Sequence, residues 1–369
     1  MNSKNTPELS RRSFLKSSVV AGVSVAASSV TAVSEEREGV SENQNSVLSA
    51  NSRALLSRFN LKYPIFQAAP GGEDLAIAVC NNGAMGAISL TWSTPDDSFA
   101  LVRKMNEATE GNYYANFVLH FDPVSLDKAI EAGCPNFQFS WGIPDAEIVG
   151  RIRNAGAGLG IQVSSGPNAV QALEREPDFL ICQGLEAGGH VQATSALRPS
   201  IQDVLDVAGD VPVLAAGGLS TGADMRNVMN DGAAGIVLGT RFMATRESDA
   251  HDVYKQQLVD ANDESTIYTI CFDKDWSAAM HRVLRNTTTR DWEAAGCPNT
   301  GNKPGENDVV ATHPVFGQAT RYETVPPLVG HEGALEEMAM YAGEGVGKVT
   351  DLPSAGDLIR RVWAEFENA

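Results

Sequence analysis

Cysteine is scarce in this 369-residue chain, and its spacing excludes two classes of protein. The five cysteines are far apart and include no CxxC pair. The sequence therefore supports neither a zinc site nor a dense disulfide framework, and we predict no bound metal. A single disulfide outside the cell stays open.

Basic residues are also few. The chain has 28 Lys and Arg against 46 Asp and Glu, which gives a formal net charge of −18. Such a surface repels nucleic acid, so we expect no nucleic-acid partner. No feature of the sequence predicts an oligomeric state.

A long, strongly apolar run is missing as well. Residues 1–32 contain Arg11 and Arg12, then Phe14, Leu15 and Lys16, then an uncharged stretch rich in Ala, Val and Ser. This is the pattern of a twin-arginine export signal. The stretch falls short of the ~20 strongly apolar residues of a spanning helix, so we expect export to the periplasm or the exterior without a stable membrane anchor.

The alternatives for this N-terminal segment are a disordered basic terminus and a membrane anchor. Residues 33–52 follow it and are rich in Ser and Glu. We interpret them as a polar linker.

Residues 53–246 alternate short β-branched or aromatic runs with stretches of helical periodicity, a pattern that indicates parallel strands joined by crossover helices. Eight such runs are found, at 63–68, 85–90, 113–119, 136–141, 158–163, 179–183, 213–216 and 235–238. Because eight strands close a barrel, the pattern predicts an α/β fold of the (β/α)8 TIM-barrel class. A doubly wound open sheet is the alternative, but no GxGxxG follows the first run.

The rhythm changes after the eighth run. Helical patterns at 248–261, 333–341 and 355–367 surround a Gly-, Pro- and Asn-rich region at 297–307. We therefore predict that residues 247–369 form a mostly helical C-terminal cap or lid beside the barrel mouth.

Glycines follow the seventh and eighth runs. Gly217-Gly218 comes after the seventh run, and Gly239-Thr240 after the eighth. Glycine lets backbone N–H groups approach phosphate oxygens closely, and the loops after strands 7 and 8 are the usual phosphate site of such barrels. Either segment alone is more often a tight turn, whereas the two together predict phosphate binding.

The sixth run leads into the most specific motif of the chain, Gln183-Gly184-Leu185-Glu186-Ala187-Gly188-Gly189-His190. A histidine on a loop held by two glycines has a pKa suited to proton transfer near neutrality. The motif resembles the signature of the nitronate monooxygenases, also called 2-nitropropane dioxygenases. The resemblance covers roughly residues 53–362 and includes Asn116-Phe117 and, near the end, Ala342-Gly343-Glu344-Gly345.

The resemblance implies a barrel that holds FMN. It assigns His190 as the catalytic base and implies cofactor contacts for ten residues, which are Ala68, Asn116, Gln183, Gly188, Gly217, Gly218, Val237, Leu238, Gly239 and Thr240. It also implies that Glu186 orients the loop. His120 is interpreted as a surface histidine, with a role at the site as the alternative, and the remaining histidines as structural or solvated.

The implied reaction is the FMN-dependent oxidation of nitronates or nitroalkanes by O2 to a carbonyl compound and nitrite. One alternative is an NAD(P)H-dependent flavin reductase on the same barrel, either quinone or enoyl reductase-like. A second is a secreted flavin-binding protein without turnover. Departures from the family pattern at Ala69, Val191 and Glu344 bear on the substrate more than on the flavin.

Overall fold

The computed structural model describes residues 48–369. The predicted signal, 1–32, and residues 33–47 of the predicted linker lie outside this range. Residues 50–52 were assigned to the linker, but they belong to helix α2 (Ala50–Phe59), which Ser49 caps by accepting the Ser52 N–H. No helix within 48–369 is long and apolar enough to cross a membrane.

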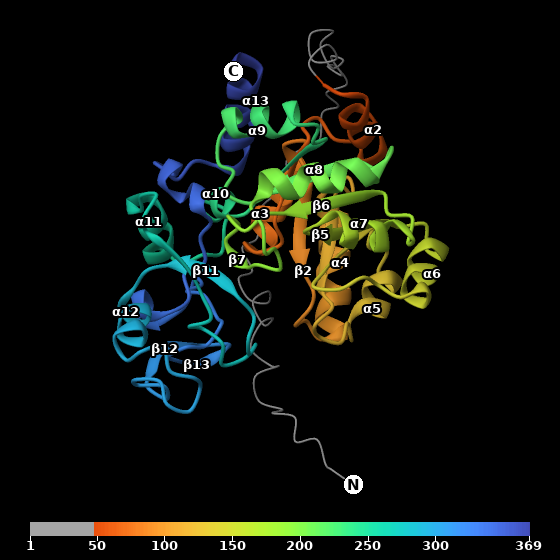
Figure 1. Ribbon diagram of the computed structural model, residues 1–369. Coiled ribbons are helices and arrows are strands. Elements are labelled where there is room, and N and C mark those ends of the chain that lie inside the picture. Colours follow the sequence, from red (N-terminus) through yellow and green to blue (C-terminus); the bar gives the residue numbers. More distant parts are fainter. Residues whose placement is uncertain (1–47) are drawn as a thin grey trace, which may run out of the picture.

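Alternating strands and helices form the first and larger part of the structure (Figure 1). They run in the order β1 (Ile65–Gln67), α3 (Gly72–Asn81), β2 (Gly86–Ser89), α4 (Pro95–Ala108), β3 (Tyr113–Val118), α5 (Leu126–Glu131), β4 (Asn136–Ser140), α6 (Ala146–Asn154), β5 (Gly158–Val163), α7 (Gly166–Leu173), β6 (Phe179–Gln183), α8 (Leu197–Ala208), β8 (Val213–Ala216), α9 (Gly222–Asn230) and β9 (Gly235–Leu238). Ser, Thr or Asp caps α4, α6, α7 and α9 by accepting a backbone N–H of the first turn.

The eight parallel strands pair in the order β1-β9-β8-β6-β5-β4-β3-β2. The ring closes between β1 and β2 through a parallel bridge of Phe66 with Met85. The Met85 N–H donates to the Ile65 carbonyl at 3.0 Å, and the Gln67 N–H donates to the Met85 carbonyl at 2.9 Å. The predicted (β/α)8 barrel is confirmed.

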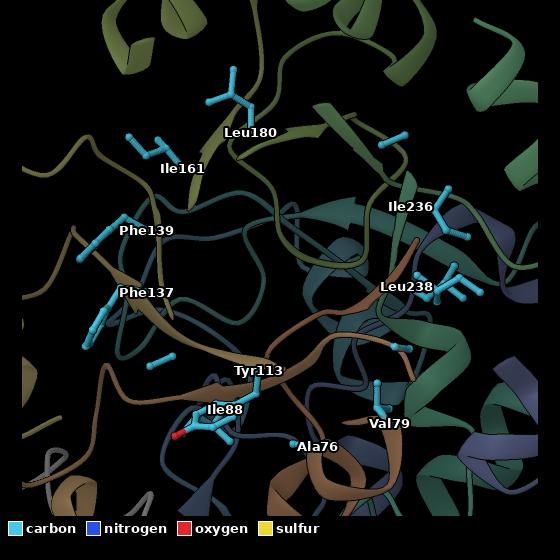
Figure 2. Packing of buried hydrophobic residues seen from close by; sticks show 14 of the residues in the cluster. Ala76, Val79, Ile88, Tyr113, Phe137, Phe139, Ile161, Leu180, Ile236 and Leu238 are labelled. Carbon is cyan, nitrogen blue, oxygen red and sulfur yellow. The ribbon is translucent and has the colours of Figure 1, made fainter. Parts of the chain in front are cut away.

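Two apolar layers hold the barrel together. Large buried side chains lie around the outside of the strand ring and pack against the helices, as Figure 2 shows for Phe137, Ile161 and Leu180. Inside the ring, Phe179 contacts the rings of Phe66 and of Phe59 on α2, at centroid distances of 5.4 and 5.5 Å. A side chain at Gly160 would collide with the Phe179 ring, so this glycine makes room for it.

Residues after β9 form the short helix α10 (Thr240–Met243) and then a cap, which lies to one side of the barrel (Figure 1). The cap contains α11 (Asp252–Asp260), β10 (Thr266–Thr269), β11 (His281–Leu284), α12 (Thr287–Ala294), β12 (Val309–His313), β13 (Gly317–Thr320), β14 (Glu332–Gly333) and the 3-10 turns η1 (Leu335–Glu337) and η2 (Glu344–Lys348). It holds helices, as predicted, and also five strands that were not predicted. Three of these strands form one sheet, and the other two form a second sheet with a short strand from the loop after β6. Only η1 is helical within the helix predicted at 333–341.

The last helix, α13 (Ala355–Asn368), does not belong to the cap. Its residues Leu358, Val362 and Phe366 are buried in the core around the strand ring. The helix packs against α9 and α3, so it completes the helical layer outside the barrel. The predicted cap therefore ends before residue 355.

The five cysteines are all free in this structure. Four of them are buried, and Cys297 is exposed.

Candidate active site

A cavity of about 1880 Å³ opens at the carboxyl ends of the barrel strands, beneath the cap. Ten predicted site residues line it, namely Ala68, Asn116, Gln183, Gly188, His190, Gly217, Gly218, Val237, Gly239 and Thr240. Leu238 does not, because its side chain points outward into the core around the strands. Since a small-molecule site usually measures ~300–1,000 Å³, the cavity has room for a cofactor and a second molecule.

The loops after β8 and β9 form a cradle of backbone groups. Gly217 and Gly218 adopt φ angles of 128° and 67°, which favour glycine. Within the described part of the chain, no acceptor binds the N–H groups of Gly217, Gly218 or Gly239. These free donors and the bare Cα of Gly239, which lines the cavity, fit the phosphate of a flavin mononucleotide.

Side-chain amides lie on the inner wall of the cavity. Asn116, Gln138, Gln162 and Gln183 belong to the successive strands β3 to β6, and all four line the cavity. Asn116 donates to the Oε1 atom of Gln138 at 2.6 Å. Gln138 and Gln162 were not predicted, although a polar amide within each apolar strand was a usable signal.

The Gln183 side chain holds the segment that carries His190. Its Nε2 atom donates to the His190 carbonyl at 3.3 Å, and its Oε1 atom accepts the Gln192 N–H at 2.9 Å. Gln183 therefore positions the histidine backbone, in addition to the cofactor contact that the resemblance implied.

His190 lies on the two-residue strand β7 (Gly189–His190), which pairs with the cap strand β11. Its ring stacks on Trp276 at a centroid distance of 4.2 Å and an angle of 24°. His281 lies 5.2 Å and Tyr341 5.5 Å from the same ring. None of these three neighbours was predicted, because each comes from the cap, at least 86 residues further along the chain.

The Nε2 atom of His190 is buried and has no hydrogen-bond partner within residues 48–369. Burial, together with the smaller effect of the nearby His281, lowers the pKa of His190 to about 3. The imidazole is therefore neutral at physiological pH, and it belongs to a residue that lines the cavity. Buried polar atoms normally have partners, so this one fits a group that a bound molecule supplies.

His281 is occupied by its own backbone contacts. Its Nδ1 atom lies 2.9 Å from the Ala279 carbonyl, and its Nε2 atom accepts the Phe272 N–H at 3.2 Å. Burial lowers the pKa of His281 to about 4. This histidine is structural, as expected, but its place beside His190 was not foreseen.

The cap segment 342–345 closes on the motif loop. A side chain at Gly188 would collide with Ala342 and Gly343, which gives this glycine a packing role beside its predicted cofactor contact. The Gly343 N–H donates to the Thr240 hydroxyl at 2.9 Å, and the Glu344 N–H donates to the Glu186 carbonyl at 3.0 Å.

Glu186 and Arg282 both hold the motif loop in place. The Glu186 carboxylate accepts the Leu197 N–H at the start of α8, at 2.8 Å, which agrees with an orienting role. Arg282 is nearly buried, donates to the Leu185 carbonyl at 3.0 Å and pairs with Glu344 at 2.9 Å.

His120 is exposed, and its ring stacks near Trp276 at 5.4 Å and 21°. It does not line the cavity. The histidine is a surface residue, as interpreted from the sequence, and its ring packs against Phe121 and Trp276.

The family model of nitronate monooxygenase matches residues 121–365. A probable nitronate monooxygenase of Bacillus subtilis is 25% identical, over 84% of this chain and 98% of its own length. A Mycobacterium tuberculosis relative, (3aS,4S,5R,7aS)-5-hydroxy-7a-methyl-1-oxo-octahydro-1H-indene-4-carboxyl-CoA dehydrogenase, is 26% identical, over 84% of this chain and 94% of its own length.

Solved structures share the fold. A nitroalkane oxidase from Streptomyces ansochromogenes superposes with a TM-score of 0.69 and 24% identity, covering 85% of this chain and 98% of that one. FabK from Thermotoga maritima superposes with a TM-score of 0.68 and 22% identity, covering 85% of this chain and 96% of that one.

Proposed function

Because this chain belongs to the nitronate monooxygenase family, we propose that it oxidises nitroalkanes or their nitronates with O2 to a carbonyl compound and nitrite. At the coarser level, the chain is a flavin-dependent oxidoreductase. The observation that carries the proposal is the neutral imidazole of His190, a residue that lines the cavity and whose Nε2 atom is buried and unpartnered.

His190 acts as the base on a neutral nitroalkane. Its Nε2 atom takes the proton from the carbon that bears the nitro group, and the electron pair of that C–H bond moves onto the nitro group, which gives the nitronate. Burial disfavours the imidazolium, but the nitronate that forms beside it is an anion and offsets this cost. Stacking on Trp276 and the bond from Gln183 hold the imidazole in place for the transfer.

FMN is the flavin that we propose. The N–H groups of Gly217, Gly218 and Gly239 would hold its phosphate, and the amides of Asn116 and Gln138 offer hydrogen bonds on the inner wall. When bound, the flavin accepts electrons from the substrate and passes them to O2.

The test is the variant His190→Asn with two forms of one substrate. With a neutral nitroalkane, we expect a loss of ~100- to 10,000-fold in kcat/KM, because a positioned general base contributes this much. With the preformed nitronate, which has no such proton, the loss should be much smaller. Equal losses on both would mean that His190 binds or orients the anion, and no loss on either would remove it from the mechanism.

An NAD(P)H-dependent reductase on the same barrel is the second candidate, favoured by the dehydrogenase relative and by the fold shared with FabK. Anaerobic bleaching of the bound flavin separates the two. Rapid bleaching by NADH or NADPH, with none by nitronate, would favour the reductase.

We also propose export by the twin-arginine route, on the strength of Arg11 and Arg12 before a mild apolar stretch. Replacing both arginines by lysine should leave the precursor inside the cell. Undiminished export of that variant would contradict the proposal.

A further inference from the structure

We propose that the natural substrate carries an aromatic ring and no negative charge; this inference rests on the proposed function. Its basis is a group of four side chains at the cavity, Trp92, Phe121, Trp141 and Trp276, which we call the aromatic wall. All four line the cavity.

The aromatic wall is assembled from four loops. Trp92, Phe121 and Trp141 follow the neighbouring strands β2, β3 and β4, and Trp276 comes from the cap between β10 and β11. Four separate loops therefore bring aromatic side chains to one side of the cavity.

The rings form a continuous series that ends at the base. Trp276 lies 4.2 Å from His190, 4.8 Å from Trp141 and 5.1 Å from Phe121, and Phe121 lies 5.7 Å from Trp92. A molecule whose reacting carbon is next to His190 therefore has aromatic faces beside the rest of its body.

The aromatic wall is not only a buried hydrophobic cluster, because part of it is open to the cavity. Trp276 is buried with Val118 and Ala279, but Phe121 and Trp141 are half-exposed and face the cavity. Trp141 also holds a left-handed φ of 57°, and its N–H donates to Gln192 at 2.9 Å. A ring that stacks on these faces would gain roughly 2- to 10-fold in affinity over a saturated ring of the same skeleton.

The charges around the cavity select against anions. Among residues 48–369, eight Asp and Glu side chains line it, against three Lys and Arg. Two of the three, Lys104 and Lys274, already pair with Glu73 and Glu323. An excess of carboxylates lowers the local concentration of anionic molecules, so an uncharged substrate is favoured, and this is the form that needs a base.

The test compares (2-nitroethyl)benzene with (2-nitroethyl)cyclohexane, which share a skeleton but differ in aromaticity. In the flavin-loaded protein, kcat/KM should be roughly 2- to 10-fold higher for the benzene compound than for the cyclohexane compound. In Phe121→Leu, the ratio of the two values should fall to about one. The control Phe99→Leu removes a ring that lies on α4 outside the cavity, and it should leave the ratio unchanged. A ratio of one in the wild type, or the same ratio in Phe121→Leu, would overturn the aromatic part.

The charge is tested with 4-(2-nitroethyl)benzoate, which adds a carboxylate to the same ring. We expect its kcat/KM to fall at least about 10-fold below that of (2-nitroethyl)benzene, and high salt to narrow the gap. Equal values at low salt would overturn the charge part.

Binding distinguishes this inference from the proposed function. If no nitro compound turns over, the proposed reaction is wrong, and calorimetry with 2-phenylethanol and 2-cyclohexylethanol still tests the aromatic wall. Tighter binding of 2-phenylethanol, lost in Phe121→Leu, supports the wall, and equal binding of the two alcohols refutes it.

Discussion

Lowering the pH should leave proton removal by His190 almost unchanged over the range in which an ordinary histidine would lose its function. Burial lowers the pKa of His190 to about 3. A depressed pKa means that the neutral, proton-accepting form persists as the pH falls from neutrality toward 3.

The magnitude follows from this pKa. Between pH 7.5 and 5.5 the neutral fraction of an imidazole with pKa 6.5 falls about 10-fold, whereas that of a group with pKa about 3 stays above ~99%. With a neutral nitroalkane, kcat/KM should therefore change less than about 2-fold over these two pH units.

The assay is anaerobic stopped-flow reduction of the bound flavin by a neutral nitroalkane, with circular dichroism at each pH to verify folding. His190→Asn is the control, and its residual rate should show no acid limb in the same range. A wild-type profile that falls with a midpoint near pH 6.5 would refute the idea that the base is buried while it reacts.

Two further predictions concern the cradle and the stability of the fold. Gly239→Val should fold, because a Cβ at this position lies an ordinary 3.5 Å from Ala68. It should lose its flavin colour, because the side chain fills the cradle. Full flavin occupancy in this variant would contradict the phosphate assignment. As the pH falls from 6.5 to 5, the free energy of unfolding should decrease by up to about 1.4 kcal/mol per pH unit for each of His190 and His281. Both histidines have depressed pKa values in the folded protein, so the unfolded chain binds more protons in this range. Urea denaturation at several pH values measures the change.

The barrel could be predicted from the sequence because its strands are buried on both faces. Gly158–Val163, Phe179–Gln183, Val213–Ala216 and Gly235–Leu238 have the predicted bounds, and each is an apolar run between helical segments. The cap strands were missed because they are short and partly exposed, as in Thr266–Thr269, so they lack the alternation that identifies a strand.

Helix α13 illustrates a different limit. Its buried residues Leu358, Ile359, Val362 and Phe366 have helical spacing, so the helix was predicted within one residue of its end. Periodicity shows that a helix has an apolar face but not what that face contacts. The packing of this helix on the barrel, after more than 100 residues of cap, was therefore not predictable.

The candidate site was predictable where loops carry glycine at the ends of barrel strands, and His190 lies in such a loop. Trp276, His281 and Arg282 were not, because a short cap strand paired with β7 brings them there. The pairing involves two residues of β7 and leaves no pattern in the sequence.

This dependence on the cap leads to a last prediction, on Arg282, which faces Gly189 in the register of β11 and β7. Arg282→Met removes the donor to the Leu185 carbonyl and the partner of Glu344, which should loosen the strand that carries His190. A displacement of about 1 Å costs up to ~100-fold in a positioned reaction, so kcat/KM should fall about 10- to 100-fold with a neutral nitroalkane.

With the preformed nitronate, which has no proton to lose, kcat/KM should fall much less. The phosphate cradle belongs to other loops, so flavin binding should be unaffected. Arg321→Met is the matched control, because Arg321 is similarly buried and pairs with Asp291 and Glu337 within the cap. It should destabilise the protein without changing the ratio of the two rates. If both variants change that ratio alike, the effect comes from general loosening of the cap, and Arg282 has no specific part in placing the base.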